Sequence, residues 1–365
     1  MGGFRLRKVG KALAWLLLGG IILIAMPVLW IEGTCRGGAA AITAPTSASH
    51  IEPGHRRPEV TSYLSYPEWY IVHAYEDFAG VLQQHDAHAF GYLTSIRGFW
   101  SSFCSLNRLV SGRSATPLDT KVMLYTIGVS FTGEMALKGL YETTIGSLTA
   151  ALRGDERTAE DRFALAVAQD YARFLRQTPW YAYPFGTTLV RFWRETPLAS
   201  GSIVRTIERR FALSAEFALK AVYAKLIALL AGLSPAELRN RSVVRSVDLD
   251  ATTADPRVTL VRRLNAQDAI IETPRYGAFT DIVVALARRG DDIVEIAGNH
   301  NVLVTVLAPS AYRMTQPGVR ELFAIPIQSR PGWQRLGLDV QVTDLSPLIR
   351  QLASENAEFE HVYDY

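Results

Sequence analysis

Apolar residues follow three different patterns along this chain of 365 residues. Residues 12–31 are uncharged and mostly apolar, residues 63–242 carry apolar side chains every three or four positions, and from residue 243 the apolar positions alternate. About 20 apolar residues cross a bilayer as a helix, the second spacing is typical of amphipathic helices, and alternation is typical of strands. The pattern therefore predicts a single transmembrane helix, then a mainly α domain, then a C-terminal α+β domain.

Basic residues precede the apolar run at Arg5, Arg7, Lys8 and Lys11. The positive-inside rule then predicts that residues 1–11 are a cytoplasmic leader, that residues 12–31 are a membrane anchor, and that the body faces outward. A cleaved secretory signal is the alternative, because residues 39–41 are small alanines, although the run is longer than a usual signal core. The leader and the plain composition favour a bacterial inner-membrane protein with a single span and a periplasmic body.

The chain has two cysteines, Cys35 after the apolar run and Cys104 in the body. An exported chain meets an oxidising compartment, so the two can form a disulfide that ties the segment after the membrane to the folded domain. The alternative is that Cys104 is a small buried side chain and Cys35 is unpaired.

A tandem repeat follows the linker predicted at residues 32–62. Residues 76–84 resemble 169–177, residues 90–91 and 97–100 resemble 185–186 and 191–193, and residues 131–141 resemble 213–223. Because the blocks recur in the same order, we interpret residues 66–150 and 160–232 as duplicated units within a domain of residues 63–242. Two helical hairpins bury their apolar faces best against each other, so a four-helix bundle is expected.

Two of these predicted helices raise a second membrane question, because residues 122–133 and 211–232 are strongly apolar. Glu134 and Lys138 in one helix, and Glu216 and Lys220 in the other, form charged stripes that are costly in lipid. We therefore expect packed or solvated helices, with membrane contact as the alternative.

The C-terminal domain is expected from residue 243 to 365. Strands are predicted at residues 258–264, 269–272, 293–297, 302–307, 322–327 and 338–342, with a hairpin turn at 298–301. Helices are predicted at residues 276–289 and from 346 onward, packed on one face of a sheet. Residues 359–365 form either a final strand or a tail.

Charge and motifs exclude several classes of function. The net charge is +3, but the first 58 residues hold seven basic and two acidic residues, so the remainder carries −2. A nucleic-acid-binding domain carries its basic charge on the folded part, so no nucleic acid partner is expected. The chain also lacks a phosphate-binding Gly-x-x-x-x-Gly-Lys loop, a dinucleotide-binding Gly-x-Gly-x-x-Gly motif and a His-Glu-x-x-His zinc motif.

One carboxylate occurs on each predicted helix of the bundle, at positions that correspond between the repeats, and a histidine lies near the first. The candidate metal ligands are His73, Asp77, Glu134, Asp170 and Glu216. Carboxylates with imidazole are ligands of divalent metals in helical bundles. The structural alternatives are Glu to Lys pairs along each helix, or pairs of Lys138 and Lys220 with the two aspartates.

Two aromatic clusters, residues 66–70 and 180–185, form either core or a site for an apolar ligand or the membrane surface. His85 and His88 are weak metal candidates, and His300 is expected in a solvated turn. The favoured function is a membrane-anchored binding or accessory component of the envelope. A metal-dependent enzyme, or a protein that handles lipid or quinone, is the alternative.

Overall fold

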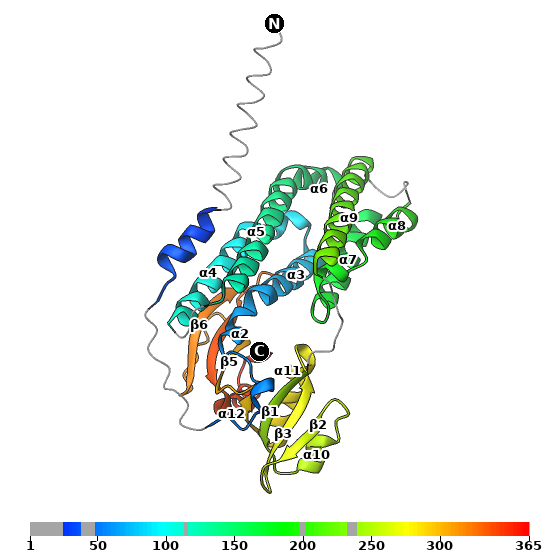
Figure 1. Cartoon of the computed structure of the whole chain (residues 1–365). Helices are drawn as coiled ribbons and strands as arrows, with labels where there is room; N and C mark the ends of the chain where they lie inside the picture. The colour runs from blue at the N-terminus through cyan, green and yellow to red at the C-terminus, as the bar shows by residue number, and fades with distance from the viewer. Residues whose placement is uncertain (1–24, 38–47, 113–115, 198–201, 232–238, 365) are drawn as a thin grey trace.

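The computed structural model describes residues 25–37, 48–112, 116–197, 202–231 and 239–364. Helices form the larger N-terminal part and two antiparallel sheets form the C-terminal part (Figure 1), which confirms the predicted order of a mainly helical region before a region of strands. Residues 25–34 are helical. Within the described residues, none of the helices combines the length and the apolar character that a membrane crossing requires. The anchor predicted at residues 12–31 lies mostly outside them.

The helical region consists of two successive units. After the short helix α2 (Val60–Leu64), the first unit contains α3 (Tyr66–Gln84), α4 (Tyr92–Ser111) and α5 (Leu118–Tyr141), and a π-helical turn (Glu142–Gly146) continues α5 into α6 (Ser147–Arg153). The second unit contains α7 (Ala159–Leu175), α8 (Phe185–Glu195) and α9 (Ile203–Ala231). Single 3-10 turns occur at Pro53–His55, Ala87–Ala89 and Trp180–Ala182.

The boundary between the two units follows from local sequence. Gly154 ends α6 with a φ of 79°, a left-handed conformation that favours glycine. Thr158 then starts α7 with a capping box, in which its hydroxyl accepts from the N–H of Asp161 and the Asp161 carboxylate accepts from the N–H of Thr158. These residues reverse the chain and bring the second unit beside the first.

The recurring sequence blocks occupy equivalent elements in the two units. Residues 97–100 and 191–193 lie in α4 and α8, and residues 131–141 and 213–223 lie in α5 and α9. Each unit therefore holds three principal helices, so the predicted bundle of two hairpins is corrected. The physical reason is that the aromatic segment expected to form a loop, at Phe90 and Phe185, instead leads directly into a helix. Helix α3 packs along α7 at the centre, α4 along α5, and α8 along α9.

The C-terminal region contains two four-stranded sheets. Sheet A consists of β1 (Arg239–Arg245), β2 (Thr259–Arg263), β3 (Asp268–Pro274) and β4 (Asp292–Ile296), in the order β2-β3-β1-β4. Sheet B consists of β5 (Asn301–Pro309), β6 (Val319–Pro326), β7 (Trp333–Gln341) and β8 (Glu358–Tyr363), in the order β6-β7-β5-β8. The helices of this region are α10 (Leu249–Thr253), α11 (Gly277–Arg289) and α12 (Val342–Leu352).

These two sheets share one topology. All neighbouring strands are antiparallel, the strand order is the same in both, and α11 and α12 each precede the last strand of their half. The C-terminal region is thus a second structural duplication, which the sequence analysis did not predict. The six predicted strands match β2 to β7, the final segment forms β8, and β1 was missed.

Each half lends its helix to the sheet of the other half. The Thr280 hydroxyl on α11 accepts from the N–H of Val362 on β8 at 3.1 Å. In the equivalent contact, the Ser346 hydroxyl on α12 accepts from the N–H of Ile293 on β4 at 3.3 Å. The predicted hairpin at residues 298–301 is corrected accordingly, because this turn joins strands of different sheets.

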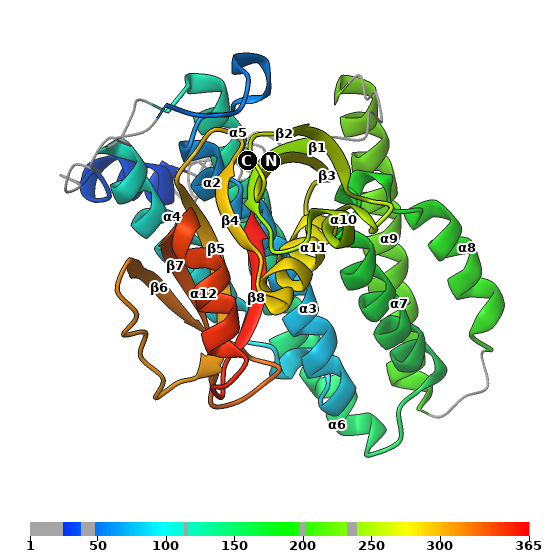
Figure 2. The same ribbon diagram turned by 90° about the horizontal axis from the view of Figure 1, so that it is seen from below.

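Sheet B lies between two hydrophobic layers (Figure 2). On one face, Leu303 and Phe323 belong to the core of the helical region. On the other, Val302 and Val304 pack in the core with α11 and α12. The helices of the C-terminal region therefore cover one face of this sheet, and α2, α3 and α4 cover the opposite face. Strands buried on both faces are expected to be almost continuously apolar, as β5 is.

Candidate functional site

The structure does not bring the five candidate metal ligands together. Asp77 faces the C-terminal region, where its carboxylate accepts from the backbone N–H groups of Gln328 and Ser329 at 3.1 and 3.4 Å. Asp170 is largely exposed and accepts from the Tyr183 hydroxyl at 3.0 Å. The separation arises because α3 and α7 turn these carboxylates away from their shared interface, toward a loop and toward solvent.

His73 lies in a different cluster, between α3 and β8. Within the described residues, its ring and the carboxylates of Glu76 and Glu360 form the one group with the geometry of a metal site. Arg335 binds Glu360 in bidentate fashion at 2.6 and 2.7 Å, and Arg176 forms a very short ion pair with Glu76. Both carboxylates already carry a guanidinium, so the cluster is built as an ion-pair contact between the two regions.

The electrostatics of this contact agree with that reading. Burial raises the pKa of Glu360, but Arg335 and His73 outweigh burial and bring the pKa to about 2. On the same strand, burial lowers the pKa of His361 to about 3. The ring of His361 stacks on Trp69, at 4.0 Å between centroids. The interface therefore holds an ionised Glu360 and a neutral His361 at neutral pH.

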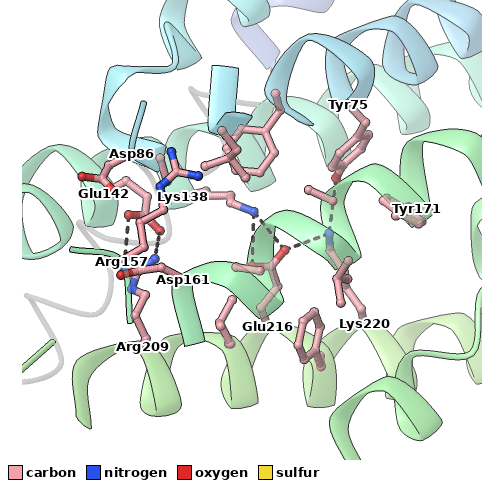
Figure 3. A pocket seen from close by; sticks show the side chains of 18 of the residues that line it. Tyr75, Asp86, Lys138, Glu142, Arg157, Asp161, Tyr171, Arg209, Glu216 and Lys220 are labelled. Atoms are coloured by element: carbon pink, nitrogen blue, oxygen red, sulfur yellow. Dashed lines mark hydrogen bonds and ion pairs between the residues drawn. The ribbon is translucent and has the colours of Figure 1, made fainter. Parts of the chain in front are cut away.

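The remaining two candidates, Glu134 and Glu216, form ion pairs exchanged between the repeats. Lys138 of the first unit pairs with Glu216 of the second at 3.0 Å, and Lys220 of the second pairs with Glu134 of the first at 2.7 Å. Lys220 also contacts Glu216 at 3.1 Å and the Tyr75 hydroxyl at 3.3 Å (Figure 3). The lysines thus pair across the bundle with glutamates, rather than with Asp77 and Asp170 as one alternative proposed.

These side chains line a cavity of about 60 Å³ between the two units. Rings of Tyr75, Tyr171 and Phe185 surround the Lys220 ammonium, at 5.1 to 5.7 Å from each centroid. A cavity of this size holds a few water molecules, whereas pockets for small organic ligands measure roughly 300–1,000 Å³. The protein's own lysine therefore occupies the aromatic site that an organic cation would otherwise fill.

A second buried network lies where α6, α7 and α9 meet. Arg205 is 1% exposed and donates to Asp161 at 2.8 Å and to Glu208 at 3.1 Å. Arg209 binds Glu142 at 2.8 and 3.1 Å. Burial raises the pKa of Asp161, but the guanidinium groups of Arg205 and Arg153 more than offset it, and the pKa is lowered overall. Charged side chains of α9 thus point into the bundle.

The opposite faces of the same helices are apolar and exposed. On α5 and α6 the exposed large apolar side chains are Leu118, Val122, Met123, Leu137, Leu140, Ile145, Leu148 and Leu152. On α9 they are Ile203, Val204, Ile207, Phe211, Leu219, Val222, Tyr223, Leu226 and Leu229. We call these two sets together the apolar face. The polarity of the helices is inverted relative to a helix in water, whose charged side points outward.

Charge is nearly absent from this face. Between residues 122 and 152 every exposed residue is uncharged, and between 203 and 229 the exposed residues include one charged side chain, Lys225. The charged stripes that argued against membrane contact are present, but they line the interior. The sequence analysis read the apolar periodicity of these helices as the core side. The signal it lacked was the position of Arg205 and Glu208 on the side opposite Ile203 and Ile207.

The segment that follows the predicted anchor is attached to this domain near the start of α5. A disulfide joins Cys35 to Cys104 of α4. Glu32 accepts from the Tyr125 hydroxyl at 2.6 Å and pairs with Lys121 at 2.9 Å, both on α5. The Tyr125 hydroxyl and Arg36 lower the pKa of Glu32 to about 2. Residues 25–35 are therefore held beside the first turns of α5 by covalent and ionic contacts.

The other sequence candidates take structural places. In the first aromatic cluster Tyr66 and Tyr70 are buried in the core, and in the second Trp180 stacks on Tyr223 of α9, at 5.1 Å between centroids. His85 and His88 are exposed at the end of α3. Comparisons of the chain with models of protein families, with curated proteins and with solved structures give no match.

Proposed function

We propose that this chain is a membrane-anchored, outward-facing binding or accessory component of the bacterial cell envelope. The observation that carries the proposal is the attachment of residues 25–35 to the helical domain through the Cys35–Cys104 disulfide and the contacts of Glu32. A body fastened within a few residues of its anchor is held at the membrane surface. A disulfide in this place suits an oxidising compartment outside the cytoplasm.

The internal architecture supports a binding role more than a catalytic one. Three of the five candidate metal ligands are engaged in ion pairs with cations, at His73, Glu134 and Glu216, or contact such a pair. The cavity between the repeats has room for a few waters, and its aromatic rings surround Lys220. We therefore favour recognition through the outer surface of the protein over a metal-dependent reaction inside the bundle.

Topology labelling of the full chain tests the proposal. A cysteine introduced by Ser354→Cys, in an exposed loop before β8, is expected to react with a membrane-impermeant maleimide in intact spheroplasts. The matched variant Lys11→Cys is expected to react only after lysis. Labelling of Ser354→Cys only after lysis would overturn the outward orientation.

Two further measurements in the same preparation complete the test. The chain is expected to stay in the membrane fraction after a carbonate wash and to keep the mass of the uncleaved N-terminus. Cys35 and Cys104 are expected to resist alkylation until a reductant is added. A shortened chain released into the soluble fraction would show that the leader is a cleaved signal and would contradict the anchor.

A further inference from the structure

We infer that the apolar face of α5, α6 and α9 is seated in the outer leaflet of the phospholipid bilayer to which the chain is anchored. The inference rests on the proposed membrane anchoring and names the surface that binds and what it binds. It concerns residues that the anchor prediction did not include.

The extent of the face is the first argument. Helix α5, the π-helical turn and α6 comprise 24, 5 and 7 residues, and α9 comprises 29. At about 1.5 Å per residue the two continuous helices are about 54 and 44 Å long. Large apolar side chains at least 38% exposed occur along both. Soluble monomers rarely expose contiguous apolar patches of more than a few hundred Å², so this face is expected to be covered.

The polar groups on the face are the second argument, because they satisfy themselves. The exposed hydroxyls of Thr126, Thr143 and Thr144 donate to the backbone carbonyls of Val122, Gly139 and Leu140 at 2.6 to 2.8 Å. Ser147 likewise donates to the carbonyl of Thr143 at 2.8 Å. Groups without access to water in lipid must be paired within the protein. A protein partner would instead be matched by hydroxyls free to bond across the interface.

The placement of charge is the third argument. Arg205, Glu208 and Arg209 are buried in the bundle, and Lys138 and Lys220 meet their glutamates beneath the face. Charged residues of helices in contact with lipid characteristically point to the protein interior and pair with one another. The inverted polarity of α9 is therefore the arrangement expected beside hydrocarbon, and it would be costly in water.

The position of the anchor is the fourth argument. Glu32 contacts Lys121 and Tyr125, so the chain leaves the predicted span at the first turns of α5, where the apolar face begins. Figure 1 shows the helix of residues 25–34 beside α4 and α5, on the side from which both helices extend. The exposed apolar side chains of Leu29 and Trp30 continue the same surface chemistry. The bilayer that holds the anchor is thus next to the face.

The face is seated in the bilayer and does not cross it. None of the described helices is long and apolar enough to span the membrane. Trp193 and Tyr223 are half-exposed on α8 and α9, and indole and phenol rings favour the level of the lipid headgroups. The geometry is that of a helical pair lying at the interface with its apolar side in the acyl chains.

Fluorescence quenching on the full chain in nanodiscs of phosphatidylethanolamine and phosphatidylglycerol tests the inference. A bimane probe is attached to Leu148→Cys on α6 or to Leu226→Cys on α9, and Ser354→Cys supplies the matched control. We expect nitroxide-labelled acyl chains to quench both face probes at least threefold more than the control. Aqueous iodide is expected to quench them at least threefold less.

Each contrary outcome has one meaning. Iodide quenching of the face probes equal to that of the control would overturn the inference, since the face would then lie in water. Protection from both iodide and nitroxide lipids, in discs that hold one or more chains, would also overturn it, because a protein would then cover the face. Either result can occur while the carbonate wash and the labelling of Ser354→Cys still support the anchor, so the two proposals fail separately.

A second variant guards against a perturbing probe. Val222→Asp places a charge on the exposed surface of α9 beside Leu226. It is expected to raise iodide quenching at Leu226→Cys at least twofold without changing quenching at Ser354→Cys. The substitution Asp250→Ala, on an exposed carboxylate of α10, is the control and is expected to change neither probe. An unchanged Leu226→Cys signal in Val222→Asp would count against lipid contact.

Discussion

In the helical repeat, arginines and glutamates are buried while leucines are exposed, whereas in the duplicated sheets apolar side chains fill the core. Arg205 on α9 is 1% exposed and Leu219 on the same helix is 67% exposed. In sheet B, Leu338 and Val304 are fully buried. Both regions arise from a repeated unit, so duplication does not determine polarity. The difference indicates that the two regions face different surroundings, the sheets water and the outer helices a covering apolar phase.

The largest effect is expected from breaking the buried charge of the helical region. Arg205→Met leaves Asp161 and Glu208 without their shared cation, and removing one partner of a buried ion pair costs about 3–5 kcal/mol of unfolding free energy. Chemical denaturation of the full chain in detergent, followed by circular dichroism, measures it. Arg191→Met, which breaks an exposed pair with Glu195, is the control and is expected to cost at most about 0.5 kcal/mol. Equal losses would show that the network is solvated.

Two matched leucines sharpen the comparison between the regions. Leu338→Ala in sheet B is expected to cost about 2–5 kcal/mol, because it leaves a cavity in a packed core. Leu219→Ala on the apolar face is expected to change the unfolding free energy in detergent by no more than about 0.5 kcal/mol. The same denaturation experiment compares them. A large loss for Leu219→Ala would place that side chain in a protein core.

The exchanged ion pairs provide a smaller and more specific test. A double-mutant cycle of Lys138→Met with Glu216→Gln is expected to give a coupling of about 0.5–3 kcal/mol, because the pair joins the two repeats. The control cycle combines Lys138→Met with Glu134→Gln, a pair on one helix at the spacing of surface ion pairs, and is expected to give less than about 0.5 kcal/mol. A larger coupling in the control cycle would favour the local pairing over the exchange.

The smallest expected effect concerns pH, where the sheet region departs from its own rule by burying His361. The folded pKa is about 3 and the unfolded value about 6.5, so this histidine contributes stability that is present above pH 6.5 and is lost as pH falls toward 3. The slope is about 1.4 kcal/mol per pH unit, so roughly 1 kcal/mol is lost between pH 6.5 and 5.5. His361→Asn is expected to remove this slope in pH-dependent denaturation.

Asp364 acts in the opposite direction and sets the control for that experiment. Burial raises the pKa of this carboxyl to about 6, even though Arg275 opposes the shift. A raised carboxyl contributes stability that is present below about pH 4 and is lost as pH rises through 6. Both the parent chain and His361→Asn retain Asp364, so its contribution cancels in their difference. An identical pH dependence in the two proteins would contradict the depressed pKa of His361.

Periodicity predicted most of the fold from the sequence because it reports local geometry. The apolar spacing of α3 and α7 and the alternation in β5 were sufficient to place these elements. Strand β1 was missed because Arg239 and Arg241 make it look polar, and their charges are matched by Glu272 on the next strand. The duplicated sheets were missed because their resemblance lies in strand order and hydrogen bonding, with no recurring residues to find.

The candidate site could be predicted only in part, for a different reason. Equivalent positions in two repeats show that residues are related by symmetry, but they do not show which face of a helix meets its neighbour. Asp77 and Asp170 are equivalent, yet one binds the loop at Ser329 and the other meets solvent. Glu134 and Glu216 are equivalent and do meet at the interface, through the lysines of the opposite unit. Packing between helices decides this, and a period of 3.6 residues does not report it.

The exchange of helices between the two sheets has a consequence for how the protein is made. Strand β8, which Thr280 binds through the N–H of Val362, is the last element to leave the ribosome, and Tyr363 on it accepts a hydrogen bond from Ser62 at the start of the helical region. The first half of the sheet region and the entrance to the helical region both wait for the final residues of the chain. Folding is therefore completed only after synthesis ends, which leaves the polypeptide open for passage through a secretion channel.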